Sequence, residues 1–542
     1  MKKLRSLLLV AAFSAVLCCS GSEPPKAPVR ATDAAEESSL RERLEEPIDL
    51  IPAALGDYDW PITTTVAKAQ EYFNQGMQLR WAFNVPESTR SMVEARRADP
   101  DCAMCWWGEA FTLGSFLNGK MSSDKAVLAR EAILKAQSLL GRSATPVEKA
   151  LIEASLVRYP EDFDPKERET SDQAFADAMA KVYAEFPEHD EVGTIYGVAL
   201  FQLEERRGDR DLEDPDLIRL HGVLTSVLDR DVRHPGACHL YIHATESSQD
   251  PGLALGCARH LGDSMPVASH IQHMPSHTWN EVGMWPESVR ANTLAWQADQ
   301  RAKDGEGFSY APSHNLHMLL FAASMDGQGA VAMQAARDYA RVGGNTMHLV
   351  LTLLRFGRFE EVLEVKSKPG GAVAAGMWDF AQGYAALRTD DAEAAQESLR
   401  KVQAAVEEFP DATFRFHKAT QILALVEEVL RGEILRAEGD LDGAIAAFER
   451  AVELDDQQDY DEPEPIPFAA RDWLGAALLE AERFTDAETV YRAGLVDHPH
   501  NVWSLHGLKQ ALAAQGKTDA AVDADFEKST ARTDAWIKAS RF

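Results

Sequence analysis

The sequence lacks the short motifs of several large enzyme classes. It contains no GxxxxGK[ST] loop and no convincing GxGxxG turn, which argues against phosphate-binding and dinucleotide-binding enzymes of those types. A GxSxG elbow, the mark of one class of serine hydrolases, is absent as well. HLYIH, residues 239–243, has the spacing of the zinc-protease motif HExxH but lacks its glutamate. Any chemistry must therefore depend on other residues.

Long apolar runs are also scarce. Leu7–Leu17 is too short for a comfortable membrane span, follows a basic region at residues 2–5 and precedes Cys18 and Cys19. This arrangement resembles a bacterial lipoprotein signal, residues 1–19, which implies a lipid on Cys19 or, less favoured, on Cys18; an ordinary cleaved signal is the alternative. Residues 20–60 are then expected to form a flexible tether. We expect a cell-envelope protein, periplasmic or anchored in the outer membrane only through its lipid.

Cysteine is rare, with six residues in the whole chain. Export to an oxidising compartment favours two disulfides, Cys102 with Cys105 and Cys238 with Cys257. The first pair is a CxxC, which could instead be redox-active or bind metal. However, no second CxxC completes a zinc knuckle, and no strand precedes the motif as in thioredoxin.

Basic residues are outnumbered: Lys plus Arg is 55 against 86 Asp plus Glu, a formal net charge of −31. Nucleic acid is therefore not expected as a partner, because its phosphates would be repelled. Cations would be attracted, although the charge could equally serve solubility alone.

Strand signals are sparse, and nearly everything after Thr64 has a helical pattern. Helix–turn–helix units recur, most clearly in GEILRAEGDLDGAIAAFERAVELDD and LGAALLEAERFTDAETVYRAGLVDHPHNVWSLHGL. These resemble tetratricopeptide repeats, which implies an all-α solenoid of helical hairpins; an alanine-rich helix array without true repeats is the alternative. We expect N-terminal repeats at 61–230, a histidine-rich central part at 231–345 and C-terminal repeats at 346–542.

The central part carries histidines at helical spacing. The candidate metal ligands fall into three runs: His239, His243 and Glu246; His270, His273 and His277; and His314 and His317. Within each run the spacing of three, four or seven residues places the side chains on one helical face. Imidazole suits zinc, copper and iron, so we predict one or two transition-metal ions. A buried histidine network or a pH-sensitive groove is the alternative reading.

Proline marks where these runs begin. They follow Pro235, Pro266 and Pro312, positions that look like the starts of the first helices of repeats. In the tetratricopeptide family those helices line the concave wall, so the resemblance implies that the runs share one cavity. Pro275 lies inside the second run and should kink that helix, which would re-aim His277.

A closer resemblance covers several stretches: DPDCAMCWWGEA, HPGACHLYIHATE, HIQHMPSH, HNLHMLLFAASM, YDEP and NVWSLHGL. Together they are similar to a family of exported bacterial tetratricopeptide proteins, which implies that the histidine runs belong to one site. The chain departs from that pattern at Val85, where the family has a histidine, and after Pro463.

We predict an exported lipoprotein that binds a transition metal through these histidines. The alternatives are a metal-dependent hydrolase or oxidoreductase, and a scaffold that binds a protein or peptide in its concave groove without metal. The acidic stretch DDQQDYDEPEPIP is expected to be a solvated linker.

Overall fold

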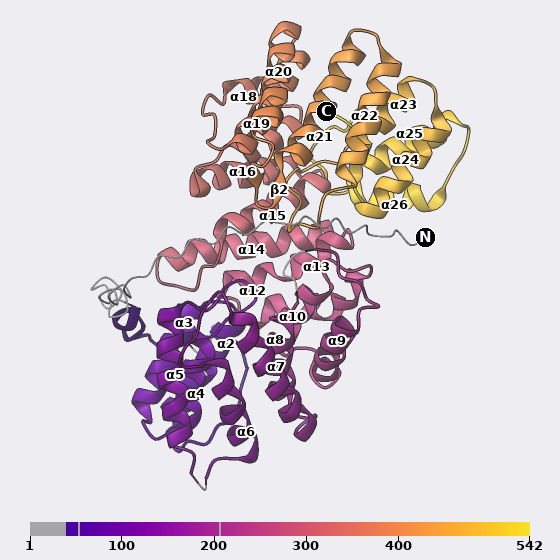
Figure 1. Ribbon diagram of the computed structural model, residues 1–542. Helices are drawn as coiled ribbons and strands as arrows, with labels where there is room; N and C mark the ends of the chain where they lie inside the picture. Colours follow the sequence, from indigo (N-terminus) through magenta and orange to yellow (C-terminus); the bar gives the residue numbers. More distant parts are fainter. Residues whose placement is uncertain (1–39, 52–54, 142, 205–207) are drawn as a thin grey trace, which may run out of the picture. The chain divides into compact units, whose positions relative to one another are not determined.

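The computed structural model describes residues 40–51, 55–141, 143–204 and 208–542 (Figure 1). Its internal contacts separate Met1–Arg43 from Leu44–Phe542. The predicted signal peptide, Cys18, Cys19 and the tether up to residue 39 lie outside the described residues. Among the helices that are described, none combines the length and the apolar character needed to cross a membrane.

The described residues are mostly helical, as predicted, and the elements have the following bounds: α2 (Ala67–Trp81), α3 (Val85–Ala98), α4 (Ala103–Leu113), α5 (Ser123–Ser138), α6 (Pro146–Ser155), η2 (Leu156–Arg158), α7 (Arg168–Glu185), α8 (Asp190–Phe201), α9 (Pro215–Leu228), α10 (Pro235–Thr245), η3 (Pro251–Ala254), α11 (Leu255–Ser264), α12 (Ser269–His273), α13 (Pro275–Glu281), α14 (Trp285–Lys303), α15 (Pro312–Met325), α16 (Gly329–Gly343), α17 (Met347–Arg355), α18 (Phe359–Glu364), α19 (Ala372–Arg388), α20 (Ala392–Glu408), β1 (Thr413–Phe414), β2 (His417–Lys418), α21 (Ala419–Ala437), α22 (Leu441–Asp455), α23 (Arg471–Glu480), α24 (Phe484–Asp497), α25 (Val502–Ala514) and α26 (Ala520–Thr530). Here η marks short 3₁₀ helices, and β1 and β2 form an antiparallel hairpin.

Helices that follow one another in the chain pack together, which is the arrangement of stacked helical hairpins (Figure 1). Contacts join α2 with α3, α4 with α5, α7 with α8, α19 with α20, α21 with α22, and α23 with α24. A single hairpin cannot bury its own apolar face, so each pair depends on its neighbours for a core. The fold is therefore an all-α solenoid of tetratricopeptide type.

Glycines at a repeated spacing allow neighbouring helices to approach each other closely. Tyr491 of α24 lies between Gly475 of α23 and Gly507 of α25, each sixteen residues away, and a Cβ on either glycine would lie 2.4 Å or less from its ring. Met92 of α3 holds the same place between Gly76 and Gly108. The same spacing at both ends of the chain shows that one packing rule, a large side chain between two glycines, repeats along the solenoid.

The folded unit begins earlier than the predicted tether allows. Described residues from Leu44 to Trp60 pack onto it: Leu55 is 1% and Trp60 5% exposed. The side chains of α2 hold this segment, since Gln75 accepts from the amide of Ile51 and Gln78 donates to the carbonyl of Leu55. Buried apolar side chains of the segment and hydrogen bonds from amide side chains of α2 hold it against the folded unit.

Two loops position the histidine-bearing helices. Ala268 and Phe308 form an isolated parallel bridge, and the amide of Tyr310 donates to the hydroxyl of Ser269. This connection ties the start of α12 to the segment before α15 and explains why the second histidine run becomes helical at Ser269 rather than directly after Pro266.

Candidate metal centre

Prolines begin three of the helices that carry the histidines, α10, α13 and α15. α10 starts at Pro235, and all of its residues are buried, so His239 and His243 enter the protein interior together. The second run is divided as predicted: α12 ends at His273, and α13 starts at Pro275 after a one-residue break. α10 contacts α13, and α12 contacts α15, which brings the three runs together.

His239, His243 and His270 form the first triad, in which the ligand nitrogens all lie within 4.8 Å of one another. These side chains are 1–2% exposed. Nδ1 of His239 donates to the carbonyl of Trp81, and Nδ1 of His243 donates to the Glu246 carboxylate at 3.0 Å. Both protons therefore lie on Nδ1, which leaves lone pairs on the two Nε2 atoms.

The buried imidazoles of this triad are incompletely hydrogen-bonded. Nε2 of His239 and both ring nitrogens of His270 have no hydrogen-bond partner among the described residues. Buried polar atoms are nearly always paired, so such a cluster calls for a ligand or an ion. The donor set fits a transition metal that prefers nitrogen.

His273, His277 and His314 form the second triad, again with ligand atoms within 4.8 Å of one another. Nδ1 of His273 lies 2.7 Å from Oδ1 of Asn292, whose amide nitrogen donates to the carbonyl of Ser288. The oxygen of Asn292 therefore faces the ring and accepts the Nδ1 proton. Nε2 of His273 is left with a lone pair only 2.7 Å from Nε2 of His277. Two such nitrogens at this distance need a proton or a cation between them.

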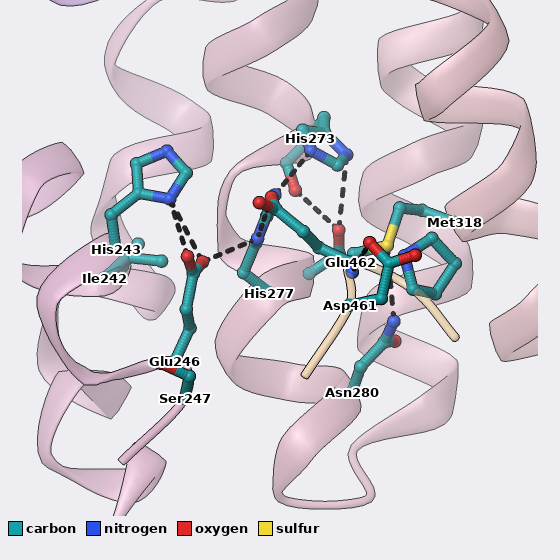
Figure 2. A network of polar contacts seen from close by, with 12 residues as sticks. Ile242, His243, Glu246, Ser247, His273, His277, Asn280, Met318, Asp461 and Glu462 are labelled. Carbon is teal, nitrogen blue, oxygen red and sulfur yellow. Dashed lines mark hydrogen bonds and ion pairs between the residues drawn. The ribbon is translucent and has the colours of Figure 1, made fainter. Parts of the chain in front are cut away.

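Glu246 links the two triads, as Figure 2 shows. Its carboxylate contacts Nδ1 of His243 and lies 2.8 Å from Nδ1 of His277, while Glu462 lies 3.3 Å from the same nitrogen of His277. These four residues form a third group whose possible ligand atoms are within 4.8 Å of one another. A carboxylate at Nδ1 favours the tautomer that presents Nε2 to a metal, which is the usual arrangement around metal-binding histidines.

The electrostatic environment keeps His239, His270 and His273 neutral and Glu246 ionised. Burial, followed by the neighbouring imidazoles, lowers the pKa of His239, His270 and His273 well below the usual value. Burial by itself would raise the pKa of Glu246, but His243 and His277 hold it well below its usual range. Neutral imidazole and carboxylate are the forms that bind metal.

Phe83 forms an aromatic wall beside the first triad. Its ring centroid lies 4.2 Å from that of His239, 5.1 Å from His270 and 6.3 Å from His243. Its backbone has a φ of 60°, a strained value for a side chain of this size. In the sequence only Val85, two residues later, stands out, because it replaces a histidine of the similar family, and nothing in the pattern predicts that Phe83 stacks on the triad.

The acidic stretch before α23 is not the solvated linker that we predicted. Asp461 and Glu462 are 3% and 6% exposed, and Glu462 reaches the metal-site group. Arg415, at the turn between β1 and β2, binds Asp461 at 2.6 Å and donates to the carbonyl of Pro463 at 2.9 Å. These contacts replace solvent for the buried charges, and acidic composition alone could not reveal them. The only signal in the sequence was YDEP, residues 460–463.

His317 lies apart from the three groups, although His314 precedes it by one turn of α15. Arg415 donates to Nδ1 of His317, which places the imidazole proton on Nε2, and the ring packs 3.9 Å from that of His348. A nitrogen carrying a proton cannot ligate a metal, so His317 belongs to a polar network with His348 and Arg415 in this structure.

Two other histidines, His234 and His260, and the predicted disulfides lie outside the triads. His234 caps α10 and contacts Glu191 at 2.9 Å, and His260 is exposed on α11. The structure pairs Cys102 with Cys105 and Cys238 with Cys257. The second disulfide joins α10 to α11, next to the first triad in sequence.

No protein-family model matches the chain, and no curated protein does. Among solved structures, the APC/C hetero-tetramer Cut9–Hcn1 has 12% identity and a TM-score of 0.30, with 82% of this chain and 90% of that chain covered. The human IFIT1 dimer with m7Gppp-AAAA has 11% identity and a TM-score of 0.29, with 79% and 89% covered. The P58(IPK) TPR domain has 12% identity and a TM-score of 0.20, with 83% and 99% covered. Similarity at this level carries no argument about what the chain binds.

Proposed function

We propose that this protein binds transition-metal ions in two tri-histidine sites, one at each triad. The observation that supports this proposal most strongly is the close approach of two imidazole nitrogens. Nε2 of His273 and Nε2 of His277 are 2.7 Å apart, and Nδ1 of each ring faces an oxygen acceptor. Either a proton on one Nε2 or a metal ion bound to both satisfies two nitrogens at this distance, and we assign a metal ion here. The unpaired nitrogens of His239 and His270 support an ion in the first triad in the same way.

The donor set narrows the class of ion. Three imidazoles suit zinc, copper or iron, and a three-histidine site leaves room for a further ligand. Glu246 and Glu462 would offset part of the charge of two divalent ions. Because the histidines of the first triad are at most 2% exposed, a large substrate has no direct contact with that ion. This burial favours metal binding over hydrolysis of a polymer.

Elemental analysis tests the proposal. The untagged protein starting at Ser20 should carry close to two equivalents of zinc, copper or iron, and a variant with His239, His243, His273 and His277 changed to alanine should carry none. His260→Ala is the matched control, because this exposed histidine lies outside both triads. A wild-type protein that stays folded but remains empty after metal is supplied would refute the proposal.

Export and lipid attachment at Cys19 are proposals that rest on residues 1–19 of the sequence. Mass spectrometry of the mature N-terminus in a bacterial host tests them, since a lipidated Cys19 and a cleaved, unmodified N-terminus differ in mass. The scaffold alternative predicts a protein partner that binds equally well to the four-histidine variant.

A further inference from the structure

A small cavity borders the first triad. It has a volume of about 20 Å³, and its walls include His239, Phe83, Arg80 and Phe116. A water-sized ligand needs roughly 10–15 Å³ measured in this way, so the cavity accepts a molecule of that class. A larger cavity of about 490 Å³ lies beyond it, and both are lined by Phe116, Leu117 and Gln202. These three side chains form the wall between the two spaces.

Arg80 gives the small cavity a positive charge. Its side chain is 2% exposed and donates to the carbonyls of Thr112, Gly114 and Ser115, while no carboxylate of the described residues forms an ion pair with it. Burial, and then the neighbouring guanidinium of Arg158, lowers the pKa of Arg80 to about 9. The guanidinium also lies 5.2 Å from the ring centroids of Phe111 and Phe116. Carbonyls and aromatic rings do not neutralise a buried cation, and an anion in the adjacent space would offset the cost of burying it.

A metal ion in the first triad would add a second positive charge beside the cavity. His239 both borders the cavity and belongs to the triad. Two cations that share a small cavity repel each other unless a negative charge lies between them. A tri-histidine ion also has an open coordination position, to which an anion can bind directly.

Resting on the proposed metal sites, we infer that the cavity between Arg80 and the first triad binds a small inorganic anion as an additional ligand of the metal ion. The guanidinium of Arg80 acts as its counter-charge. The anion enters from the 490 Å³ cavity past Phe116 and Leu117. Only anions of a few atoms fit, and organic carboxylates of substrate size are excluded by the volume.

Copper and azide test the inference in the full, untagged chain. Cu²⁺ is the probe metal because nitrogen sites bind it most tightly among the divalent first-row ions. Copper content is measured first, and azide is then titrated while the absorption of a copper–azide band is followed. The wild type should show saturable azide binding. Arg80→Met should bind azide about 10- to 100-fold more weakly at unchanged copper content, as expected for a missing unit charge a few ångströms away.

Three further variants separate the effect of the Arg80 charge on azide binding from loss of folding and from a change in the entry path of azide. Arg80→Lys keeps the charge and should bind azide more tightly than Arg80→Met, whereas Lys120→Met, at the outer cavity, should leave the affinity unchanged. If Arg80→Met does not fold, Leu117→Trp leaves Arg80 in place and should slow azide binding at unchanged copper content.

Each contrary result has a distinct meaning. A protein that binds stoichiometric copper but shows no copper–azide band would refute an open coordination position for an anion. It would not contradict the proposed metal sites. Equal azide affinity in Arg80→Met and the wild type would overturn the role of Arg80 as counter-charge. An unchanged rate of azide binding in Leu117→Trp would overturn entry past Phe116 and Leu117. A wild-type protein that binds no copper would overturn this inference together with the proposed function.

Discussion

Replacing Glu246 by glutamine tests both metal sites with one change of nearly equal size. The carboxylate contacts Nδ1 of His243 at 3.0 Å and of His277 at 2.8 Å, so a single residue orients one imidazole in each triad. A glutamine side chain offers one oxygen acceptor and one NH₂ donor. One oxygen of Glu246, Oε2, contacts both Nδ1 atoms, and Oε1 lies 3.1 Å from Nδ1 of His243. Glutamine therefore replaces a charged acceptor by a neutral one and turns an NH₂ group towards an imidazole that has to donate. Both imidazoles are then held less firmly in the tautomer that presents Nε2 to a metal, and His243 is affected most.

The size of the effect follows from these contacts. Loss of a carboxylate that orients a metal-binding histidine typically weakens metal binding about 10- to 100-fold, which corresponds to roughly 1.4–2.8 kcal/mol. Glu462 lies 3.3 Å from Nδ1 of His277 and can serve as its second acceptor. We therefore expect the first triad, with His243, to lose more affinity than the second.

Isothermal titration with zinc and competition against a chelator at pH 7 would measure both affinities. Glu281→Gln is the matched control, because Glu281 lies on α13 four residues after His277 but belongs to none of the three groups. Burial, followed by repulsion from Glu464, raises the pKa of Glu281 to about 8, so its side chain is mostly neutral at pH 7 and glutamine imitates it. Equal zinc affinities for Glu246→Gln and the wild type, at equal folding, would refute the orienting role of Glu246.

Three further variants test the packing and charges around the site by urea unfolding. Gly475→Ala should destabilise the protein by about 1–3 kcal/mol, because the new Cβ would lie 2.4 Å from the ring of Tyr491. Gly222→Ala, whose Cβ would have no atom within 4 Å, should be neutral or slightly stabilising. Equal effects of the two substitutions would contradict the packing rule. Arg415→Met should destabilise the protein by about 2 kcal/mol, because it removes the arginine from the fully buried carboxylate of Asp461, whose remaining contacts include His417 and the amide of Glu462. An unchanged urea midpoint would argue against this role of Arg415. The pKa of His498 is raised to about 9: burial opposes protonation, but the charge and hydrogen bond of Glu464 outweigh it. This stabilisation of the folded state is complete below about pH 6.5 and is lost as pH rises through 9. The free energy of unfolding of the wild type should therefore fall by about 1–2 kcal/mol over that interval, a figure reduced for solvent screening because Glu464 is half-exposed. The unfolding free energy of His498→Gln should depend less on pH.

The helices and the histidine faces could be predicted because both depend on residues close in sequence. Helical periodicity placed His239 and His243 on one face, and the missing amide proton of Pro275 predicted the break between α12 and α13. The sixteen-residue spacing of Gly475 and Tyr491 likewise reflects a local hairpin that repeats along the chain.

Other features of the site depend on side chains that meet across long sequence separations. Glu462 reaches His277 only because the segment before α23 is held by Arg415, and its acidic neighbours suggested a solvated linker instead. Phe83 and Arg80 border the first triad although their sequence carries no metal-site pattern. His317 has the spacing of a ligand, yet a distant arginine decides which of its nitrogens carries the proton.

The sequence by itself thus determined the all-α repeat architecture and which histidines share a helical face, since backbone geometry within a helix relates residues three or four positions apart. Only the tertiary structure decided which faces meet, which nitrogen of each imidazole bears a lone pair, and which carboxylate and guanidinium lie beside them. Those properties depend on distances and hydrogen-bond acceptors between helices, and these exist only once the helices have packed.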